Sequence, residues 1–266
     1  MALTRWLLFT AMIVAGLAGF QAAAAQQTEE GPNERAASLE RLVAVAEEYT
    51  VTIGGSEERL ELVKAPVLRY SDPVSSISDG VVLAWTKDGR PEAVMALHPG
   101  SKDRTWIEYQ SLSLSPLNAV STNQPDWHPR GPGVGFRPLD GVPRPDTGAA
   151  DRLAQMRSML RPFSASVSDN QGGRQELRLL SRPIFRYAQT DRGIIDGALF
   201  AFVRATNPEL LIVVEAQVVD GQPHWHYSPA RFTGRACDLR IKDQLIWSHD
   251  VLPRPKDPAA PYFQSY

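Results

Sequence analysis

The feature that most constrains this chain is a repeat of its own pattern at a fixed offset of 117 residues. Residues 60–97 align with residues 177–214 without a gap, and at least ten of the 38 aligned pairs are identical. Average residue usage would give roughly two or three identities by chance. The identical pairs include Arg69/Arg186, Tyr70/Tyr187, Asp79/Asp196, Gly80/Gly197, Pro91/Pro208 and Glu92/Glu209. Because the period is far longer than that of a solenoid repeat, we expect a tandem duplication of a domain-sized module.

Each half carries one helical pattern followed by short β-rich runs. Residues 33–47 and 148–161 place apolar side chains at helical spacing, with Asn33 suited to cap the first helix and Pro162 to end the second. The β-rich runs are too closely spaced for helical crossovers, so they must pair antiparallel. They are expected at 49–53, 60–63, 67–70, 80–86, 93–97, 106–113 and 117–120, and then at 163–167, 177–187, 198–203, 210–218, 225–232, 237–241 and 245–247.

These patterns predict an α+β fold of two tandem-duplicated modules. Each module is expected to be one amphipathic helix packed on an antiparallel β-meander, and the two modules are expected to be related by a pseudo-twofold axis. The boundaries that follow are 1–25 for a signal peptide, 26–128 for the first module, 129–147 for a Pro/Gly-rich linker or ordered strap, 148–252 for the second module, and 253–266 for a Pro-rich, loosely held tail.

The first residues have the layout of a secretory signal peptide. Arg5 is followed by an apolar run over 6–19, and Ala23-Ala24-Ala25 provides a cleavage signal. The apolar run is shorter than the ~20 residues that a membrane-spanning helix needs. We therefore expect export, to the periplasm or the extracellular space of a bacterium, with cleavage near Ala25.

Net charge, apolar runs and cysteine content limit the partners and the disulfide bonds that this chain can have. Loss of Arg5 with the leader would change the formal net charge from −2 to −3, which gives no electrostatic basis for nucleic-acid binding. The mature sequence has no apolar run long enough to span a membrane. Cys237 is the single cysteine, so no internal disulfide can form, and its apolar setting predicts a small buried residue on a strand.

Several segments of the second half resemble an unnamed family of uncharacterised predicted exported bacterial proteins. The segments are 177–180, 183–187 and 196–203, and the resemblance covers most of the mature chain. No activity is assigned to that family. The resemblance therefore implies export and a bacterial source, and it supplies no catalytic residues.

A histidine pair is the strongest metal-binding candidate in the sequence. His224 and His226 are two apart on an expected strand, so both imidazoles would face the same side. His249, Asp250 or Asp238 could supply a third ligand. The alternative is a pair of surface histidines on either side of a core tryptophan, which the absence of any established metal-ligand spacing favours.

Arginine and aspartate recur together in both halves. Pairing of neighbouring strands would bring Arg69 near Asp79 and Arg186 near Asp196. These pairs are either structural bridges that close the intervening loops or two ligand sites for anions or carboxylates, because guanidinium groups suit such ligands. Duplication favours the structural role, since both modules must solve the same folding problem.

The tryptophans offer a further alternative. Trp106 and Trp127 are matched at similar spacing by Trp225 and Trp247, so we expect the pairs at equivalent core positions. Exposed rings would instead provide a platform for a glycan.

The sequence contains no established nucleophile, dinucleotide or phosphate-loop motif, and no cofactor is expected. It favours a non-enzymatic binding or interaction module with a protein or glycan partner. That hypothesis predicts that no pocket gathers two or more polar side chains with shifted pKa values. The alternative is a hydrolase or metal-dependent enzyme of unrecognised type that uses His224 and His226.

Overall fold

The structure is a computed structural model that describes residues 32–100, 104–169, 172–253 and 257–265. The expected signal peptide, with its cleavage point at Ala25, lies outside the described residues. Within the described part of the chain, no helix is both long enough and apolar enough to cross a membrane.

The first half forms one helix, a meander and a small two-stranded sheet. Its elements are α1 (Pro32–Glu47), β1 (Thr50–Ile53), β2 (Glu61–Asp72), the 3-10 helix η1 (Pro73–Ser75), β3 (Ile77–Lys87), β4 (Arg90–Pro99), β5 (Thr105–Ser111) and β6 (Leu117–Val120). β2 to β5 are joined in the order β16-β5-β4-β3-β2, while β1 pairs separately with β6. α1 begins at Pro32, so Asn33 lies inside its first turn rather than at its cap.

The second half has a similar order of elements, with two strands in place of β2 and one more strand at its end. They are α2 (Ala149–Met159), β8 (Phe163–Ser168), β9 (Arg174–Leu179), β10 (Phe185–Gln189), the 3-10 helix η2 (Thr190–Arg192), β11 (Ile194–Arg204), β12 (Asn207–Val219), β13 (Gln222–Arg231), β14 (Cys237–Ile241) and β15 (Gln244–His249). These strands join in one sheet in the order β15-β14-β8-β9-β11-β12-β13-β7, with β10 also paired to β11. β7 (Arg137–Pro138) comes from the segment between the halves.

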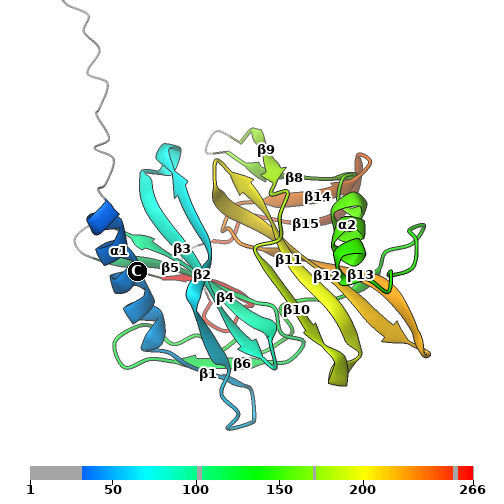
Figure 1. Cartoon of the computed structure of the whole chain (residues 1–266). Coiled ribbons are helices and arrows are strands. Elements are labelled where there is room, and N and C mark those ends of the chain that lie inside the picture. Colours follow the sequence, from blue (N-terminus) through cyan, green and yellow to red (C-terminus); the bar gives the residue numbers. More distant parts are fainter. Residues whose placement is uncertain (1–31, 101–103, 170–171, 254–256, 266) are drawn as a thin grey trace, which may run out of the picture.

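The two sheets pack face to face, and the two helices cover their outer faces on opposite sides of the molecule (Figure 1). A central core between the sheets contains Val82 from the first half and Leu199 from the second. An outer core lies under α1 around Leu42, and the other lies under α2 around Met156. The predicted α+β class, with antiparallel strands and one helix against each sheet, is therefore confirmed at this level.

The middle strands are buried on both faces because a helix and a second sheet cover them. Consecutive residues of β3 alternate between cores, with Val81 and Leu83 under α1, and Val82 and Ala84 between the sheets. β11 alternates in the same way between the α2 core and the central core. Two covered faces explain why these strands are continuous apolar runs instead of alternating polar and apolar residues.

Two of the predicted segments differ in the structure. The strand expected over 177–187 is two strands, β9 and β10, because the chain leaves the sheet between Leu179 and Phe185. The prediction of a loosely held tail over 253–266 is wrong for residues 257–265. There β16 (Tyr262–Ser265) pairs with β5, and it buries Tyr262 in the central core and Phe263 in the core under α1.

The segment between the halves is an ordered strap rather than a free linker. Val134 is buried in the central core, with Phe136 packed against it, and Arg137 and Pro138 pair with β13. The strap and β16 therefore both tie the second half to the first.

The predicted equivalence of Trp106 and Trp225 is wrong by one position. Trp106 lies opposite His98 in the strand pairing, and the residue equivalent to His98 in the second half, 117 positions later, is Glu215. Trp225, however, lies opposite Ala216, one position further on. A shift of one residue turns a side chain to the opposite face of the sheet. Trp225 is accordingly buried under α2, while Trp106 is only half-buried.

Candidate functional site

The two predicted Arg–Asp pairs form, at identical registers. Arg69 pairs with Val81 across β2 and β3, and Arg186 pairs with Ala198 across β10 and β11, again 117 residues on. Arg69 Nη2 donates to both carboxylate oxygens of Asp79 at 2.8 Å. Arg186 donates from Nε to Asp196 Oδ1 at 3.0 Å and from Nη2 to Oδ2 at 2.6 Å.

Each pair also holds the helix of its own half. Arg69 Nη2 donates to the Arg35 carbonyl at 3.1 Å, and Arg186 Nη2 donates to the Ala149 carbonyl. Asp196 accepts a further bond from Arg152 Nε of α2 at 2.8 Å. The guanidinium groups are thus occupied by carboxylates and helix carbonyls, an arrangement that favours the structural role over anion binding.

The histidine pair gathers no metal-ligand set. His226 pairs across strands with Glu215, whose carboxylate is already bound by Arg90, Tyr187 and Gln217. Within the described ranges, no group of three or more His, Cys, Asp or Glu side chains could hold a metal ion. His224 is exposed and Trp225 between the two is buried, as in the surface-pair alternative.

The five tryptophans in the described part of the chain do not form an exposed platform. Trp85, Trp127 and Trp225 are buried, and Trp106 and Trp247 are half-buried. Cys237 is buried on β14, as predicted. The glycan-platform alternative therefore gains no support from exposed rings.

The halves contact one another through two reciprocal sets of residues. From the first half, Asp72 Oδ2 accepts a hydrogen bond from Arg204 Nη2 at the β11–β12 hairpin. From the second half, Gln189 Nε2 donates to the Lys87 carbonyl at 3.2 Å, at the β3–β4 hairpin. Gln189 lies 117 residues after Asp72, and Lys87 lies 117 residues before Arg204. Each half therefore presents the same strand end to the hairpin of the other.

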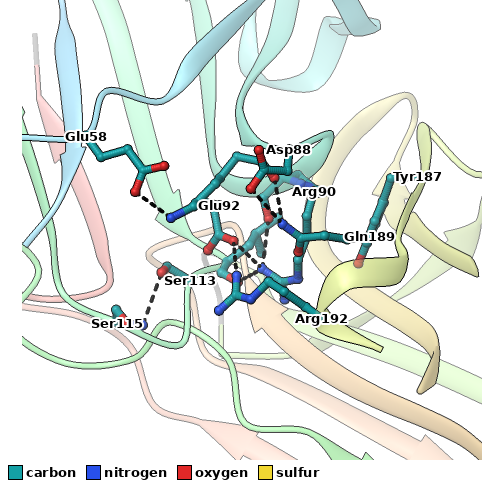
Figure 2. A network of polar contacts seen from close by, with 12 residues as sticks. Glu58, Asp88, Arg90, Glu92, Ser113, Ser115, Tyr187, Gln189 and Arg192 are labelled. Carbon is teal, nitrogen blue, oxygen red and sulfur yellow. Dashed lines mark hydrogen bonds and ion pairs between the residues drawn. The ribbon is translucent and has the colours of Figure 1, made fainter. Parts of the chain in front are cut away.

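A buried charged cluster surrounds the β3–β4 hairpin, and Figure 2 shows its members converging from both halves. Arg90 Nε donates to Glu215 Oε1 at 2.9 Å, and Tyr187 donates its hydroxyl to the same oxygen at 2.5 Å. Arg90 Nη1 lies 3.1 Å from Glu92 Oε1, which Arg192 approaches to 3.5 Å from the other half. The side chains of Arg90, Glu92 and Glu215 are each about 2% exposed or less.

This cluster borders a cavity of about 260 Å³ whose walls come from both halves. Two guanidinium groups, from Arg90 and Arg192, face two carboxylates, from Glu92 and Glu215, so the charges in the wall balance. A buried ion network of this kind needs no ligand to neutralise it. We therefore assign the Arg90 cluster to the joining of the halves, although Arg90 Nη2 has no hydrogen-bond partner among the described residues.

A larger cavity, of about 410 Å³, lies between the two sheets at Arg231. β5 contributes Gln110, β13 contributes Arg231, and β15 contributes Trp247 and His249. The remaining walls are the strap at 132–135 and the C-terminal segment at 260–262. Its size falls within the range of ligand pockets, and both halves supply its surface.

Arg231 is buried in this wall without an acidic partner. Its side chain donates only to backbone carbonyls, from Nε to Thr233 at 2.9 Å and from Nη2 to Arg235 at 2.9 Å and Asp250 at 3.2 Å. Its guanidinium carbon lies 5.5 Å from the ring centre of Tyr262. Over the described part of the chain, no carboxylate forms an ion pair with Arg231, and no hydrogen bond uses Nη1. A buried positive charge left in this state is costly unless something else neutralises it.

Three polar side chains in this wall have shifted pKa values, all because of burial. Burial lowers the pKa of Arg231 and of His249, and it raises the pKa of Tyr262 well above the usual 10. The expectation that no pocket would gather such groups is therefore wrong. However, every shift favours the uncharged form, and the pKa values of His249 and Tyr262 both move away from neutral pH, so the wall is better suited to binding than to acid–base catalysis.

Sequence reasoning did not find the Arg231 cavity. Its described residues come from five separate stretches of the chain, at 110, 132–135, 229–231, 247–252 and 260–262. The second half has Arg231 where the first half has Ser111, since Ala230 and Gln110 lie at equivalent registers opposite Leu211 and Val94. This difference between the halves was the available signal, because a buried arginine that only one half contains is not needed for the packing that the two halves have in common.

Comparisons with models of protein families, with curated proteins and with solved structures find no match to this chain.

Proposed function

We propose that this protein is a non-enzymatic binding module, built from two duplicated halves, that holds a small molecule in the cavity beside Arg231. The observation that carries the proposal is the buried Arg231 guanidinium, which faces a cavity of about 410 Å³ and has no carboxylate partner among the described residues. A ligand that neutralises this charge would remove the penalty of burying it.

The shared scaffold supports a duplicated origin of the halves. A similar element order recurs, the Arg–Asp pairs keep the same register, and Gly80 and Gly197 both lie beneath a tyrosine ring. The β3–β4 and β11–β12 pairings also shift register at equivalent places, around Glu92 and Glu209. Two copies related in this way place a seam between them, and seams between domains are common ligand sites.

Export to the periplasm or the extracellular space is the second part of the proposal. The leader pattern before Gln26 supports it. Expression of the full chain in a bacterium, followed by intact-mass measurement of the exported fraction, tests it. We expect a mature chain that starts at Gln26; an uncleaved chain confined to the cytoplasm would contradict export.

Binding is tested by nuclear magnetic resonance on the mature protein labelled with ¹⁵N. We expect a library of small neutral, acidic and basic compounds to contain members that shift the indole signal of Trp247, which lines the cavity. Trp106, which does not line the cavity, is the internal control. If no compound moves the Trp247 signal, or if all compounds move both indoles alike, the proposed cavity is not the binding site.

A further inference from the structure

Resting on the proposed function, we infer that the cavity beside Arg231 selects a small monocarboxylate with a compact apolar body, and that Nη1 of Arg231 recognises the carboxylate. The inference concerns the class of ligand, which the proposed function leaves open. It depends on the charge of the wall, on the free donors of Arg231 and on the apolar lining.

The charge of the wall favours an anion. Among the described residues, the ionisable side chains that line the cavity are Arg231, His249 and Tyr262, and none of the described lining residues is an aspartate or a glutamate. Burial keeps His249 and Tyr262 uncharged near neutral pH, since it lowers the pKa of the first and raises that of the second. One positive charge therefore remains in the wall, and a ligand with one negative charge balances it. This wall differs from that of the Arg90 cavity, where two arginines face two glutamates.

The hydrogen bonds of Arg231 fix its guanidinium group and leave one edge free. Three backbone carbonyls accept from Nε and Nη2, while Nη1 has no partner in the described structure. A guanidinium that is already held in place loses little side-chain freedom when it binds, and its free N–H groups match the oxygens of a carboxylate. Hydrogen bonds between two charged groups are also about twice as strong as neutral ones.

The remaining lining is apolar and limits the size of the ligand. Trp247, Leu252 and Val134 line the cavity, together with prolines of the strap, of β13 and of the C-terminal segment. Burial of an apolar body against these side chains contributes roughly 25 cal/mol for each Å² removed from water. A compact ring or branched chain that bears one carboxylate matches both parts of the wall.

The test is isothermal titration calorimetry of the mature protein with benzoate and with benzamide, which have the same ring and differ in charge. We expect benzoate to bind at least about tenfold more tightly, because only its carboxylate makes a charge-assisted bond. The Arg231→Gln variant is expected to weaken benzoate binding by about 10- to 100-fold and benzamide binding by less than about threefold.

Two glycine variants keep the test decisive if Arg231→Gln fails to fold. Gly135 lines the cavity and a Cβ there would meet nothing within 4 Å, so Gly135→Leu adds bulk at the wall without a backbone clash. Gly131 is equally open but does not line the cavity, and Gly131→Leu is the matched control. We expect benzoate binding to be lost in the first variant and kept in the second.

The outcomes separate the two proposals. Equal affinities for benzoate and benzamide, both lost in Gly135→Leu, would overturn carboxylate selection and leave the binding cavity in place. Benzoate binding that persists in Gly135→Leu would show a site elsewhere and overturn the inference. If neither probe binds while other compounds still shift the Trp247 indole signal, the carboxylate class is wrong and the proposed function stands.

Discussion

The two hairpins at the centre of the molecule, β3–β4 and β11–β12, each bury an arginine at their tip, but the arginine comes from a different strand in each. Arg90 opens β4 and pairs across the hairpin with Lys87, whereas Arg204 closes β11 and pairs with Asn207. The two arginines therefore occupy opposite strands of equivalent cross-strand pairs. Each still contacts the glutamate of its own hairpin, Glu92 in one and Glu209 in the other.

The surroundings of the two arginines differ in how completely they are filled. Arg204 Nη2 donates to Asp72 Oδ2 and, at 2.6 Å, to Ser75 Oγ of the other half. Each arginine leaves one buried nitrogen without a hydrogen-bond partner in the described structure, Nε in Arg204 and Nη2 in Arg90, and Arg90 in addition lines the cavity of about 260 Å³. The comparison shows that each hairpin buries an arginine against its own glutamate and against a carboxylate of the other half, while the strand that supplies the arginine can change.

The largest effect is expected from removal of either arginine. Arg204→Met leaves Asp72 and Glu209 buried without their shared cation, which typically costs about 3–5 kcal/mol of unfolding free energy. Arg90→Met is expected to cost less, because Arg192 still lies 3.5 Å from Glu92, and Tyr187 and Gln217 still donate to Glu215. Urea unfolding of both variants measures the difference.

A matched variant separates lost charge balance from lost packing. In the double variant Arg90→Met/Glu215→Gln one uncompensated carboxylate is removed, so part of the Arg90→Met loss should be recovered. The comparison between the hairpins breaks down if Arg90→Met is the more destabilising of the single variants, or if neither costs more than about 1 kcal/mol.

An intermediate effect is expected where both halves pass a tyrosine ring over a glycine. A Cβ on Gly80 would lie 2.4 Å from the Tyr70 ring, and one on Gly197 would lie 2.5 Å from the Tyr187 ring. Gly80→Ala and Gly197→Ala should each cost about 1–3 kcal/mol, because both rings are buried and cannot move freely.

Thermal unfolding measures both alanine variants, with Gly131→Ala as the control, since a Cβ at Gly131 meets nothing within 4 Å. Equal losses in the two halves would sharpen their equivalence. A large loss in one half and none in the other would show that the two sites only look alike.

The smallest effect is expected in the pH dependence of stability at the Arg204 hairpin. Burial raises the pKa of Glu209 above its usual 4.5. A raised folded-state pKa means that the native state binds the proton more tightly, so this contribution is present below about pH 4.5 and is lost as the pH rises through the folded-state pKa. Glutamine does not titrate, so Glu209→Gln should not lose stability between the unfolded-state and the folded-state pKa of Glu209.

The measurement is the difference in unfolding free energy between wild type and Glu209→Gln from pH 4 to pH 7. We expect the difference to change in favour of the variant as the pH rises, by less than the effect of either arginine variant. Glu40→Gln, on the exposed face of α1, is the control and should show no such trend. A flat difference for Glu209→Gln would contradict the assignment.

Local patterns in the sequence predicted much of the scaffold. The helices near 33–47 and 148–161 and the strands at 117–120 and 237–241 follow from residue spacing, since neighbours on one face of an element are fixed by its period. The Arg69–Asp79 and Arg186–Asp196 pairs were predictable because adjacent strands of a meander have few possible registers. The expected match of Trp106 with Trp225 failed because the two residues differ by one position in strand register. The sequence order of the tryptophans does not show such a shift, yet a shift of one residue places a side chain on the opposite face of the sheet.

The sequence by itself determined the kinds of elements, their order in each half and the ion pairs between neighbouring strands, because all of these depend on short separations along the chain. Only the tertiary structure decided that residues 262–265 complete the sheet of the first half, that two arginines are sealed at the seam, and that Arg231 faces a cavity without an acidic partner. Those features depend on which distant segments meet when two apolar sheets bury one another. Close packing of the two sheets determines which segments are in contact, and the local periodicity of the sequence carries no information about it.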